Sequence, residues 1–376
     1  MPSERYEISV PLKKLLIGLL VTVVPISIVG LYSMTHSQNS LERMVGVHFR
    51  IIAEHVAAEV SQFVHDRATS VGVLAFEPVV MDAVKAANQS YQGMGDQAVS
   101  DRINQIEKIW NTPAANAAVE RILSSPASKL LRRYRDLDRR FLRITVTDEK
   151  GAVIAATHKT LDYLQADEDF WQAIYAQGRG AVSLTDILYD DVTKSHYIGV
   201  GVPIMEEGSN RFIGVVDSLL EVSAIFPIIN RAQLGPASRT LLVKEEGTII
   251  SGPQISLAMK QKSDEYTAVQ DYFTAAGVRS SGYLVSDLKV GGPHLIAFAD
   301  AGLQKDYANL GWKVLVSQEA SEAFAPIRMV NRMLSFMALM GLATVVFLSV
   351  YFSLHRRKVY ADLTAAQADS RESTGS

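Results

Sequence analysis

TVTDEKGAVIAA, at residues 145–156, is echoed by LLVKEEGTIISG at residues 241–252. In both stretches a charged turn that ends at a glycine separates two apolar runs, a pattern typical of a β-hairpin. The turn glycines, Gly151 and Gly247, lie about 96 positions apart. The two stretches therefore predict two hairpins at equivalent places in a repeated unit.

A second pair of similar stretches supports this repeat. LLEVSAI at residues 219–225 aligns with VSQEASEAF at residues 316–324, which places Glu221 and Glu319 about 98 positions apart. Two independent pairs with nearly the same offset favour an internal duplication over chance. We therefore expect an α+β fold with two copies of one module, each a helix followed by a mainly antiparallel sheet.

Strand-like runs continue after each hairpin and define the two modules. In the first module, residues 141–232, a helical segment at residues 167–177 follows the hairpin. The expected strands of this module are residues 142–147, 152–157, 181–189, 196–204 and 212–220. In the second module, residues 233–330, the expected strands are 239–244, 248–251, 282–288, 294–300 and 311–317. A last helix is expected to begin at Glu319.

Two uncharged apolar runs, residues 15–34 and 333–354, bracket this part of the chain. Each is long enough to cross the roughly 30 Å hydrocarbon core of a bilayer as a helix. Basic residues precede the first run and follow the second, and the positive-inside rule then places residues 1–14 and 355–376 in the cytoplasm. We therefore expect a two-pass membrane protein with residues 35–332 on the extracytoplasmic side.

The first apolar run has a competing interpretation as a cleaved signal peptide. Its apolar part exceeds the usual h-region and no Ala-x-Ala site follows it, so a retained transmembrane helix is preferred. The tail at residues 355–376 has the composition of a basic anchor followed by the start of a signalling helix. No transmitter follows in this sequence, so we expect an effector that is fused in a longer protein or acts as a separate partner.

Composition argues against several classes of function. The net charge of −3 and the pI of about 6.3 provide no basic surface for nucleic acid. The chain has no cysteine, so it can form no disulfide, thiolate nucleophile or cysteine zinc site. It lacks the Gly-x-Ser-x-Gly, phosphate-loop and His-Glu-x-x-His motifs. We expect no catalytic site, no metal and no cofactor.

Residues 35–140 are expected to be mainly helical and to begin with a stalk. Apolar residues recur from Leu41 to Leu74 at an eleven-residue period, which is close to that of a straight helix. Only Arg67 interrupts this stripe, and the helix is expected to end just before Pro78. The stripe has two compatible roles: it covers the sheets of its own chain, and it pairs with a second copy as a dimer seam.

The rest of this region is expected to form shorter helices that are broken at Pro113 and Pro126. It ends in a charged stretch, Arg132–Arg143, in which aspartates alternate with arginines. A solvated helix face with internal ion pairs is the preferred interpretation of this stretch, and an anion site is the alternative.

The most specific stretch of the chain is DEDFWQAIYAQGRGAVSLTDILYDDVTKSHYIGVGVPIMEEGSNRFIGVVDSLLEV, residues 167–222. A helix with paired aromatics is followed by a tyrosine-aspartate turn, a strand ending in Val-Pro-Ile and a Phe-Ile-Gly-Val strand. With the anchored helix, the tandem modules and the return helix, this order resembles the double Cache sensor domain of bacterial transmembrane receptors over about residues 38–330. The resemblance implies two PAS-like modules in a bacterial inner membrane protein, with residues 141–232 distal and residues 233–330 proximal to the membrane.

The resemblance also implies a set of pocket residues in the distal module. The family's paired pocket aromatics fall on Phe170 and Trp171, and its turn tyrosine falls on Tyr189. Tyr163 and Tyr197 are further lining candidates, although a half-buried tyrosine in a sheet protein is more often part of the core.

The charged positions of the family's amino-acid-binding subset are not kept. The arginine that holds the ligand carboxylate would fall on Glu168, which reverses the charge. The aspartate that holds the ligand amine would fall on Leu219, although Asp217 lies two residues earlier and therefore on the same strand face. Glu168 lies between Asp167 and Asp169, and such an acidic cluster repels a carboxylate.

These positions lead to a hypothesis about the ligand. Flat aromatic faces beside carboxylates suit an organic cation, such as an amine, through cation–π attraction and charge pairing. The sequence predicts a site built from Phe170, Trp171, Tyr189, Asp217, Glu168, Asp169, Tyr163 and Tyr197. The competing interpretation is that Asp167, Glu168 and Asp169 simply stabilise the start of a helix.

The leading functional hypothesis is a membrane-bound homodimeric receptor, of the kind that feeds histidine kinases of two-component systems, chemoreceptors, cyclases or phosphatases. Its distal module would bind a small molecule, and its helices would pass a small shift across the bilayer to a cytoplasmic effector. The alternative is a membrane-tethered solute-binding or envelope scaffold protein without signalling. An extracytoplasmic enzyme is the third possibility.

Overall fold

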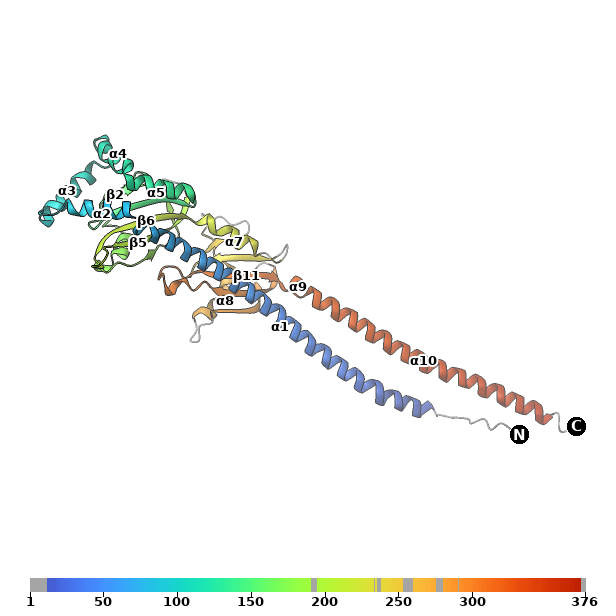
Figure 1. Ribbon diagram of the computed structural model, residues 1–376. Coiled ribbons are helices and arrows are strands. Elements are labelled where there is room, and N and C mark those ends of the chain that lie inside the picture. The colour runs from blue at the N-terminus through green and yellow to red at the C-terminus, as the bar shows by residue number, and fades with distance from the viewer. Residues whose placement is uncertain are drawn as a thin grey trace. The chain divides into compact units, whose positions relative to one another are not determined.

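The computed structural model describes residues 12–372 except residues 191–194, 233, 235–237, 253–259, 275–279 and 290. Both sheets belong to one compact unit, Val47–Glu319, and the terminal segments Met1–Gly46 and Ala320–Ser376 form the other. Figure 1 shows two successive sheets beside a long N-terminal helix, α1 (Leu12–Ala75). The predicted combination of a long helix and two antiparallel sheets is confirmed.

The first sheet, named the distal sheet after the module expected from the sequence, has the strand order β2-β1-β6-β5-β3, with β4 paired to β5. All of its described pairings are antiparallel. Its strands are β1 (Phe141–Asp148), β2 (Val153–Ala156), β3 (Ser183–Leu184), β4 (Leu188–Asp190), β5 (Ser195–Met205) and β6 (Phe212–Glu221).

One predicted strand of this sheet is wrong as a continuous element. Residues 181–189 form two short strands, β3 and β4, with a break between them. At the break the amide of Ile187 donates to the Asp186 side chain at 2.7 Å, and the Thr185 hydroxyl accepts from the amide of Gly199 at 2.7 Å. Because these side chains replace backbone acceptors, the regular ladder is interrupted.

The second sheet, called the proximal sheet, repeats the first. Its strand order is β8-β7-β11-β10-β9, and each described pairing is antiparallel. Its strands are β7 (Arg239–Val243), β8 (Ile249–Ser251), β9 (Ser281–Leu288), β10 (Gly292–Asp300) and β11 (Lys313–Glu319). The same order of hairpin, central strand and outer strands confirms the repeat that the sequence predicts.

The two turn glycines hold equivalent positions. Gly151 has φ of +83° and Gly247 has φ of +84°, a left-handed conformation that glycine adopts at little cost. A Cβ atom on Gly151 would lie 2.5 Å from the Cβ atom of Ala166. On Gly247 it would lie 2.3 Å from the ring of Tyr266. Both hairpin turns therefore require glycine for its conformation and for its small size.

Gly151→Ala is expected to destabilise the protein by about 2–4 kcal/mol, because the left-handed conformation and the clash with Ala166 both cost free energy. Gly93→Ala provides the matched control, since Gly93 has φ of +82° and nothing lies within 4 Å of its Cβ position. The control should cost about 1 kcal/mol. Urea unfolding monitored by circular dichroism would measure the difference, and equal losses in the two variants would contradict this account.

Opposite faces of the distal sheet carry different helices. One face is covered by α2 (Pro78–Gln89), α4 (Asn116–Ser124) and α5 (Pro126–Leu137), and α3 (Asp96–Ile109) lies between α2 and α4 in the chain. The other face is covered by α6 (Asp169–Tyr175). The predicted breaks are confirmed, because Pro113 begins a 3-10 turn and Pro126 begins α5 after the N-cap Ser125.

The apolar stripe of α1 covers the two modules. Within the Val47–Glu319 unit, the stripe residues Phe49, Val56, Val60, Val71 and Leu74 are all buried. Arg67 interrupts the stripe because it forms an ion pair with Asp138. The helix also accepts a hydrogen bond at the Ser70 carbonyl from the Tyr134 hydroxyl, at 2.9 Å. The role of the stripe in covering its own chain is confirmed, and α1 ends at Ala75, close to the predicted boundary.

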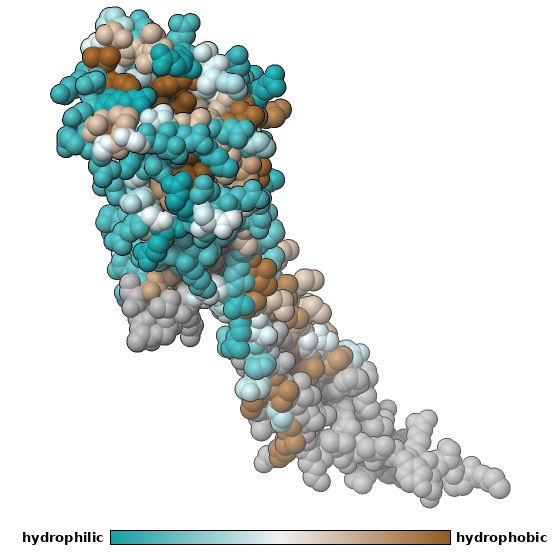
Figure 2. Space-filling view, turned by 60° about the vertical axis from the view of Figure 1, so that its left-hand side comes forward, coloured by the Kyte–Doolittle hydropathy of each residue, from teal (hydrophilic) through white to brown (hydrophobic). Residues whose placement is uncertain are grey.

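The terminal unit contains α9 (Ala320–Ala323) and α10 (Ala325–Glu372). Within the described residues, one segment, Ala325–Leu348, is long and apolar enough to cross a membrane. Its large apolar side chains are exposed, among them Met333, Phe336 and Phe347. Figure 2 shows such hydrophobic residues in brown on the helical part of the surface. The other apolar run, residues 15–34, lies on α1, and most of its side chains fall outside the described residues.

Candidate functional site

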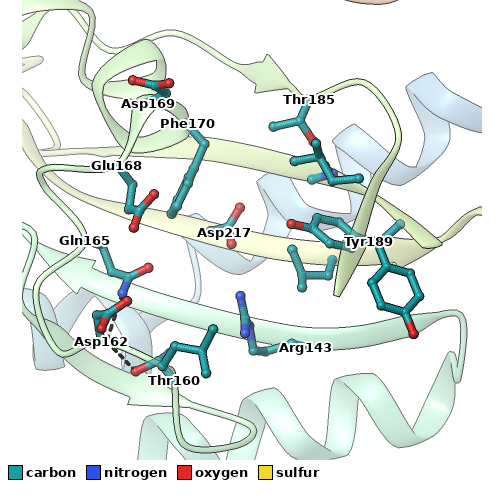
Figure 3. Close-up of a pocket in the computed structure, with 15 residues that line it drawn as sticks. Arg143, Thr160, Asp162, Gln165, Glu168, Asp169, Phe170, Thr185, Tyr189 and Asp217 are labelled. Carbon is teal, nitrogen blue, oxygen red and sulfur yellow. Dashed lines mark hydrogen bonds between the residues drawn. The ribbon is translucent and has the colours of Figure 1, made fainter. Parts of the chain in front are cut away.

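A cavity of about 380 Å³ lies on the face of the distal sheet that carries α6. Figure 3 shows the side chains that surround it. They come from the strands, from the start of α6 and from two connecting segments. The lining residues are Arg143, Thr160, Leu161, Asp162, Gln165, Glu168, Asp169, Phe170, Thr185, Leu188, Tyr189, Tyr197, Gly199, Asp217 and Leu219.

The sheet register forms the floor of the cavity. Arg143 on β1 is opposite Leu219 on β6, and Leu219 is opposite Gly199 on β5. Asp217 shares this face because it lies two residues before Leu219. Gly199 allows Thr185 to lie close to the floor, since a Cβ atom on Gly199 would lie 2.9 Å from the Thr185 hydroxyl. The floor therefore presents one carboxyl and one guanidinium side chain, and Thr185 lies against it at Gly199.

The start of α6 forms the roof. Figure 3 shows Glu168 and Phe170 directed towards Asp217, whereas the carboxyl group of Asp169 points away from it. Glu168 is the N-cap residue of α6, but its side chain makes no capping hydrogen bond. The helix-capping interpretation thus finds no support at Glu168, whose carboxyl group is available to the cavity.

The segment before α6 is held in place from outside the cavity. The Glu107 carboxylate of α3 accepts hydrogen bonds from the backbone amides of Tyr163 and Leu164, each at 2.8 Å. The indole of Trp110 donates to the carbonyl of Thr160 at 3.0 Å. These hydrogen bonds fix the wall that contributes Thr160, Asp162 and Gln165, so this side of the cavity is preformed.

The other wall is the broken strand between β3 and β4. Thr185 exchanges two hydrogen bonds with Gly199, at 3.0 Å and 2.7 Å, which fixes it beside the floor. Leu188 and Tyr189 follow, and both side chains are about half exposed, at 48% and 49%. The ring of Tyr189 packs edge-on against His196 at 5.1 Å between centroids. This wall therefore combines an anchored residue with two accessible apolar surfaces.

The electrostatic environment of the cavity disfavours the binding of a further negative charge. Burial raises the pKa of Asp217 to about 6, although nearby Arg143 acts in the opposite direction. Burial also raises the pKa of Glu168 and of Asp162, and neighbouring acidic residues add to both effects. Since the charged form of each carboxyl is penalised, a cation placed among them would relieve that penalty.

Six of the eight predicted site residues meet at the cavity. They are Glu168, Asp169, Phe170, Tyr189, Tyr197 and Asp217. Trp171 is not among the lining residues; it is 3% exposed and lies in a core cluster with Ile174, Phe212 and Val215. Its indole donates to the Thr147 hydroxyl at 3.0 Å, so the ring is directed into the core beside the cavity.

Tyr163 is also not among the lining residues. This ring packs with Val99, Ile103 and Ala152, and its centroid lies 5.2 Å from that of Trp110. Burial raises the pKa of its hydroxyl to about 12. Tyr163 therefore belongs to the contact between α3 and the first hairpin, in agreement with the general tendency of half-buried tyrosines to pack in a core.

Arg143 is the most informative residue that the sequence reasoning missed. It lies within the expected strand 142–147, but it also ends the charged stretch Arg132–Arg143, for which a solvated helix face is the preferred interpretation; α5 ends at Leu137 and Arg143 lies on β1. The signal was the alternation of polar Arg143, Thr145 and Thr147 with apolar residues. Thr160, Asp162 and Gln165 carried no comparable signal, because they lie in an irregular segment.

Solved structures that are similar to this chain include ligand-binding domains of chemoreceptors. One is that of Pseudomonas fluorescens CtaA in complex with L-isoleucine, with 14% identity, a TM-score of 0.45, and coverage of 77% of this chain and 98% of that chain. Another is that of Pseudomonas aeruginosa PAO1 PctC in complex with GABA, with 15% identity, a TM-score of 0.43, and coverage of 75% and 99%. A search of curated proteins found no match.

A family model gives the assignment. The model described as Cache domain, of the double Cache type, matches residues 37–327. This range contains α1 from residue 37 onward, the helices over the distal sheet and both sheets. The chain belongs to the Cache domain family.

Proposed function

We propose that this protein is an extracytoplasmic sensor whose distal module binds a small organic cation and signals across a membrane to a cytoplasmic effector. Double Cache domains are ligand-binding sensor domains, which supports the general role. The observation that carries the ligand class is the set of carboxyl groups, Asp162, Glu168 and Asp217, around one cavity.

Charge and shape both support a cationic ligand. Of the described lining residues, Arg143 alone is basic, whereas four are acidic. Phe170 and Tyr197 contribute aromatic rings beside these carboxyls. An ammonium group between an aromatic face and a carboxylate gains both cation–π attraction and charge pairing, which are strongest where water is excluded. The cavity volume of about 380 Å³ suits a molecule of modest size.

The membrane part of the proposal rests on the terminal helices. The exposed apolar segment Ala325–Leu348 fits a membrane span, and the run at residues 15–34 supplies the second one in the proposed two-pass topology. Chain continuity gives the output route, because β11 ends at Glu319 and α9 begins at the next residue. We further propose a homodimer through the exposed face of α1, where Ile51 and Val73 are each about half exposed.

Isothermal titration calorimetry on the full chain in lipid nanodiscs would test the ligand class. The probes are choline, putrescine and ethylamine as cations, together with L-amino acids and succinate. We expect binding of at least one cation and none of succinate. Phe170→Ala should weaken cation binding by about 5- to 30-fold, because the cation–π contribution is about 1–2 kcal/mol in a desolvated site.

Glu168→Gln should weaken cation binding by about tenfold through the loss of one charge-assisted contact. Glu246→Gln is the matched control, because Glu246 is exposed in the second hairpin turn, outside the distal module. The control should bind like the wild type. Binding of succinate alone, or unchanged cation affinity in both pocket variants, would contradict the proposed ligand class.

A further inference from the structure

The segment Thr185–Tyr189 faces two ways. Thr185, Leu188 and Tyr189 line the cavity of the distal module. Asp186, between them in the chain, is not among the lining residues and instead contacts residues of the proximal module. One short segment therefore touches both the ligand cavity and the second sheet.

The contacts of Asp186 are specific. Its Oδ2 atom forms an ion pair with the Lys244 Nζ atom at 2.7 Å. Its Oδ1 atom accepts a hydrogen bond from the indole Nε1 of Trp312 at 3.2 Å. The neighbouring carbonyl of Leu184 accepts from the Asn309 side chain at 3.3 Å. Three proximal residues thus hold this segment from one side.

The ion pair is partly removed from solvent. The side chains of Lys244 and Asp186 are 19% and 33% exposed, and Trp312 is 1% exposed. Both carboxylate oxygens are engaged by different donors, so the carboxylate has a fixed orientation. A charge pair held in this way contributes more than an ordinary surface pair, because water screens it less.

The two side-chain partners of Asp186 lie at the ends of two neighbouring inner strands of the proximal sheet. Lys244 directly follows β7, and Trp312 directly precedes β11. β11 pairs with β7 on one side and with β10 on the other. A displacement of Asp186 therefore acts on β7 and β11. Of these two strands, β11 ends at Glu319 and continues into α9 and α10.

We propose that Asp186 couples occupancy of the distal cavity to the proximal sheet through Lys244 and Trp312. This inference rests on the proposed sensor function and adds the contacts through which ligand binding in the distal cavity would affect the proximal sheet. A ligand that contacts Thr185, Leu188 or Tyr189 restrains the backbone on both sides of Asp186. The carboxylate then keeps or loses its two proximal partners according to the state of the cavity. By linkage, if occupancy of the cavity changes the free energy of these proximal contacts, loss of the contacts must in turn change the free energy of the cavity wall.

Hydrogen exchange of the ligand-free full chain in nanodiscs would test this route through that reciprocity. Lys244→Met removes the ion pair at a residue outside the cavity. We expect the amides of Thr185 and Gly199, which form the hydrogen bonds between the wall and the floor, to exchange about tenfold faster. Lys244→Arg should restore protection, because the guanidinium also pairs with a carboxylate.

Lys289→Met is the matched control, since Lys289 is 80% exposed and pairs with Asp264 at 3.4 Å within the proximal module. It should leave the exchange of Thr185 and Gly199 unchanged. Unchanged exchange at these two amides in Lys244→Met would overturn the proposal. Equal acceleration in the β1–β2 hairpin would also overturn it, because that would indicate general destabilisation. No ligand is used, so failure of the cation titration would not affect this result.

Discussion

Asp217→Asn is expected to weaken cation binding at pH 7 by at least about 30-fold, because loss of one buried charge partner costs about 2–5 kcal/mol. The same substitution should stabilise the ligand-free protein. Asp217 has its pKa raised from 3.8 to about 6 by burial. The ionised carboxylate then costs the folded state up to about 3 kcal/mol at neutral pH, a cost that asparagine avoids.

The pH dependence of stability has a defined sign. Between pH 3.8 and about 6 the folded protein holds a proton on Asp217 that the unfolded chain has lost. The contribution of Asp217 to stability is therefore fully present below pH 3.8 and is lost as the pH rises to about 6. The advantage of the asparagine variant should grow across this window and stay constant above it.

Urea unfolding of the ligand-free wild type and of Asp217→Asn at several pH values would measure this advantage. Calorimetry with the best-binding probe cation would follow affinity over the same range. Affinity should rise with pH through about 6 in the wild type, because the cation binds the ionised carboxylate. Parallel stability curves for the two proteins, or full cation affinity in the variant, would contradict the assignment of Asp217.

Trp171→Ala is expected to destabilise the protein by about 3–5 kcal/mol, the usual cost of removing a buried tryptophan side chain. The ring stacks on Tyr175 at 5.2 Å and meets Phe212 edge-on at 5.7 Å. Trp171→Phe should recover most of this loss, because only the hydrogen bond to Thr147 and part of the packing disappear.

Phe170→Ala is the informative comparison for Trp171→Ala. Phe170 is only partly buried and lines the cavity, so its loss should affect ligand affinity more than stability. Urea unfolding monitored by far-UV circular dichroism would rank the three variants, and cation calorimetry would be performed on those that remain folded. A Trp171→Phe variant that folds normally but loses cation binding would return Trp171 to the site.

The sequence was sufficient for elements whose pattern is local. The hairpins around Gly151 and Gly247, the breaks at Pro113 and Pro126, and the buried stripe of α1 all depend on residues close together in the chain. Their periodicity or their conformational requirement is visible without knowledge of the tertiary fold.

The direction of individual side chains was harder to predict. Phe170 and Trp171 are adjacent on α6, and successive side chains of a helix point about 100° apart. The orientation of α6 about its own axis therefore decides which ring faces the cavity and which enters the core. Arg143 reaches the cavity only through the pairing of β1 with β6, which joins residues about 76 positions apart. Such a pairing is a property of the assembled sheet, and a single sequence does not display it.

The repeated strand order gives the two modules different physical characters. Asp217 lines the cavity on the distal sheet, and its counterpart in the proximal sheet is Leu315, which pairs with Phe298. Phe298 and Leu315 join Tyr266 and Val269 in a packed core. One copy of the fold is therefore hollow, and among the described residues its twin is filled at the same place. A filled interior yields little under strain. The hollow copy is suited to change shape, and the solid copy to carry that change onward without absorbing it.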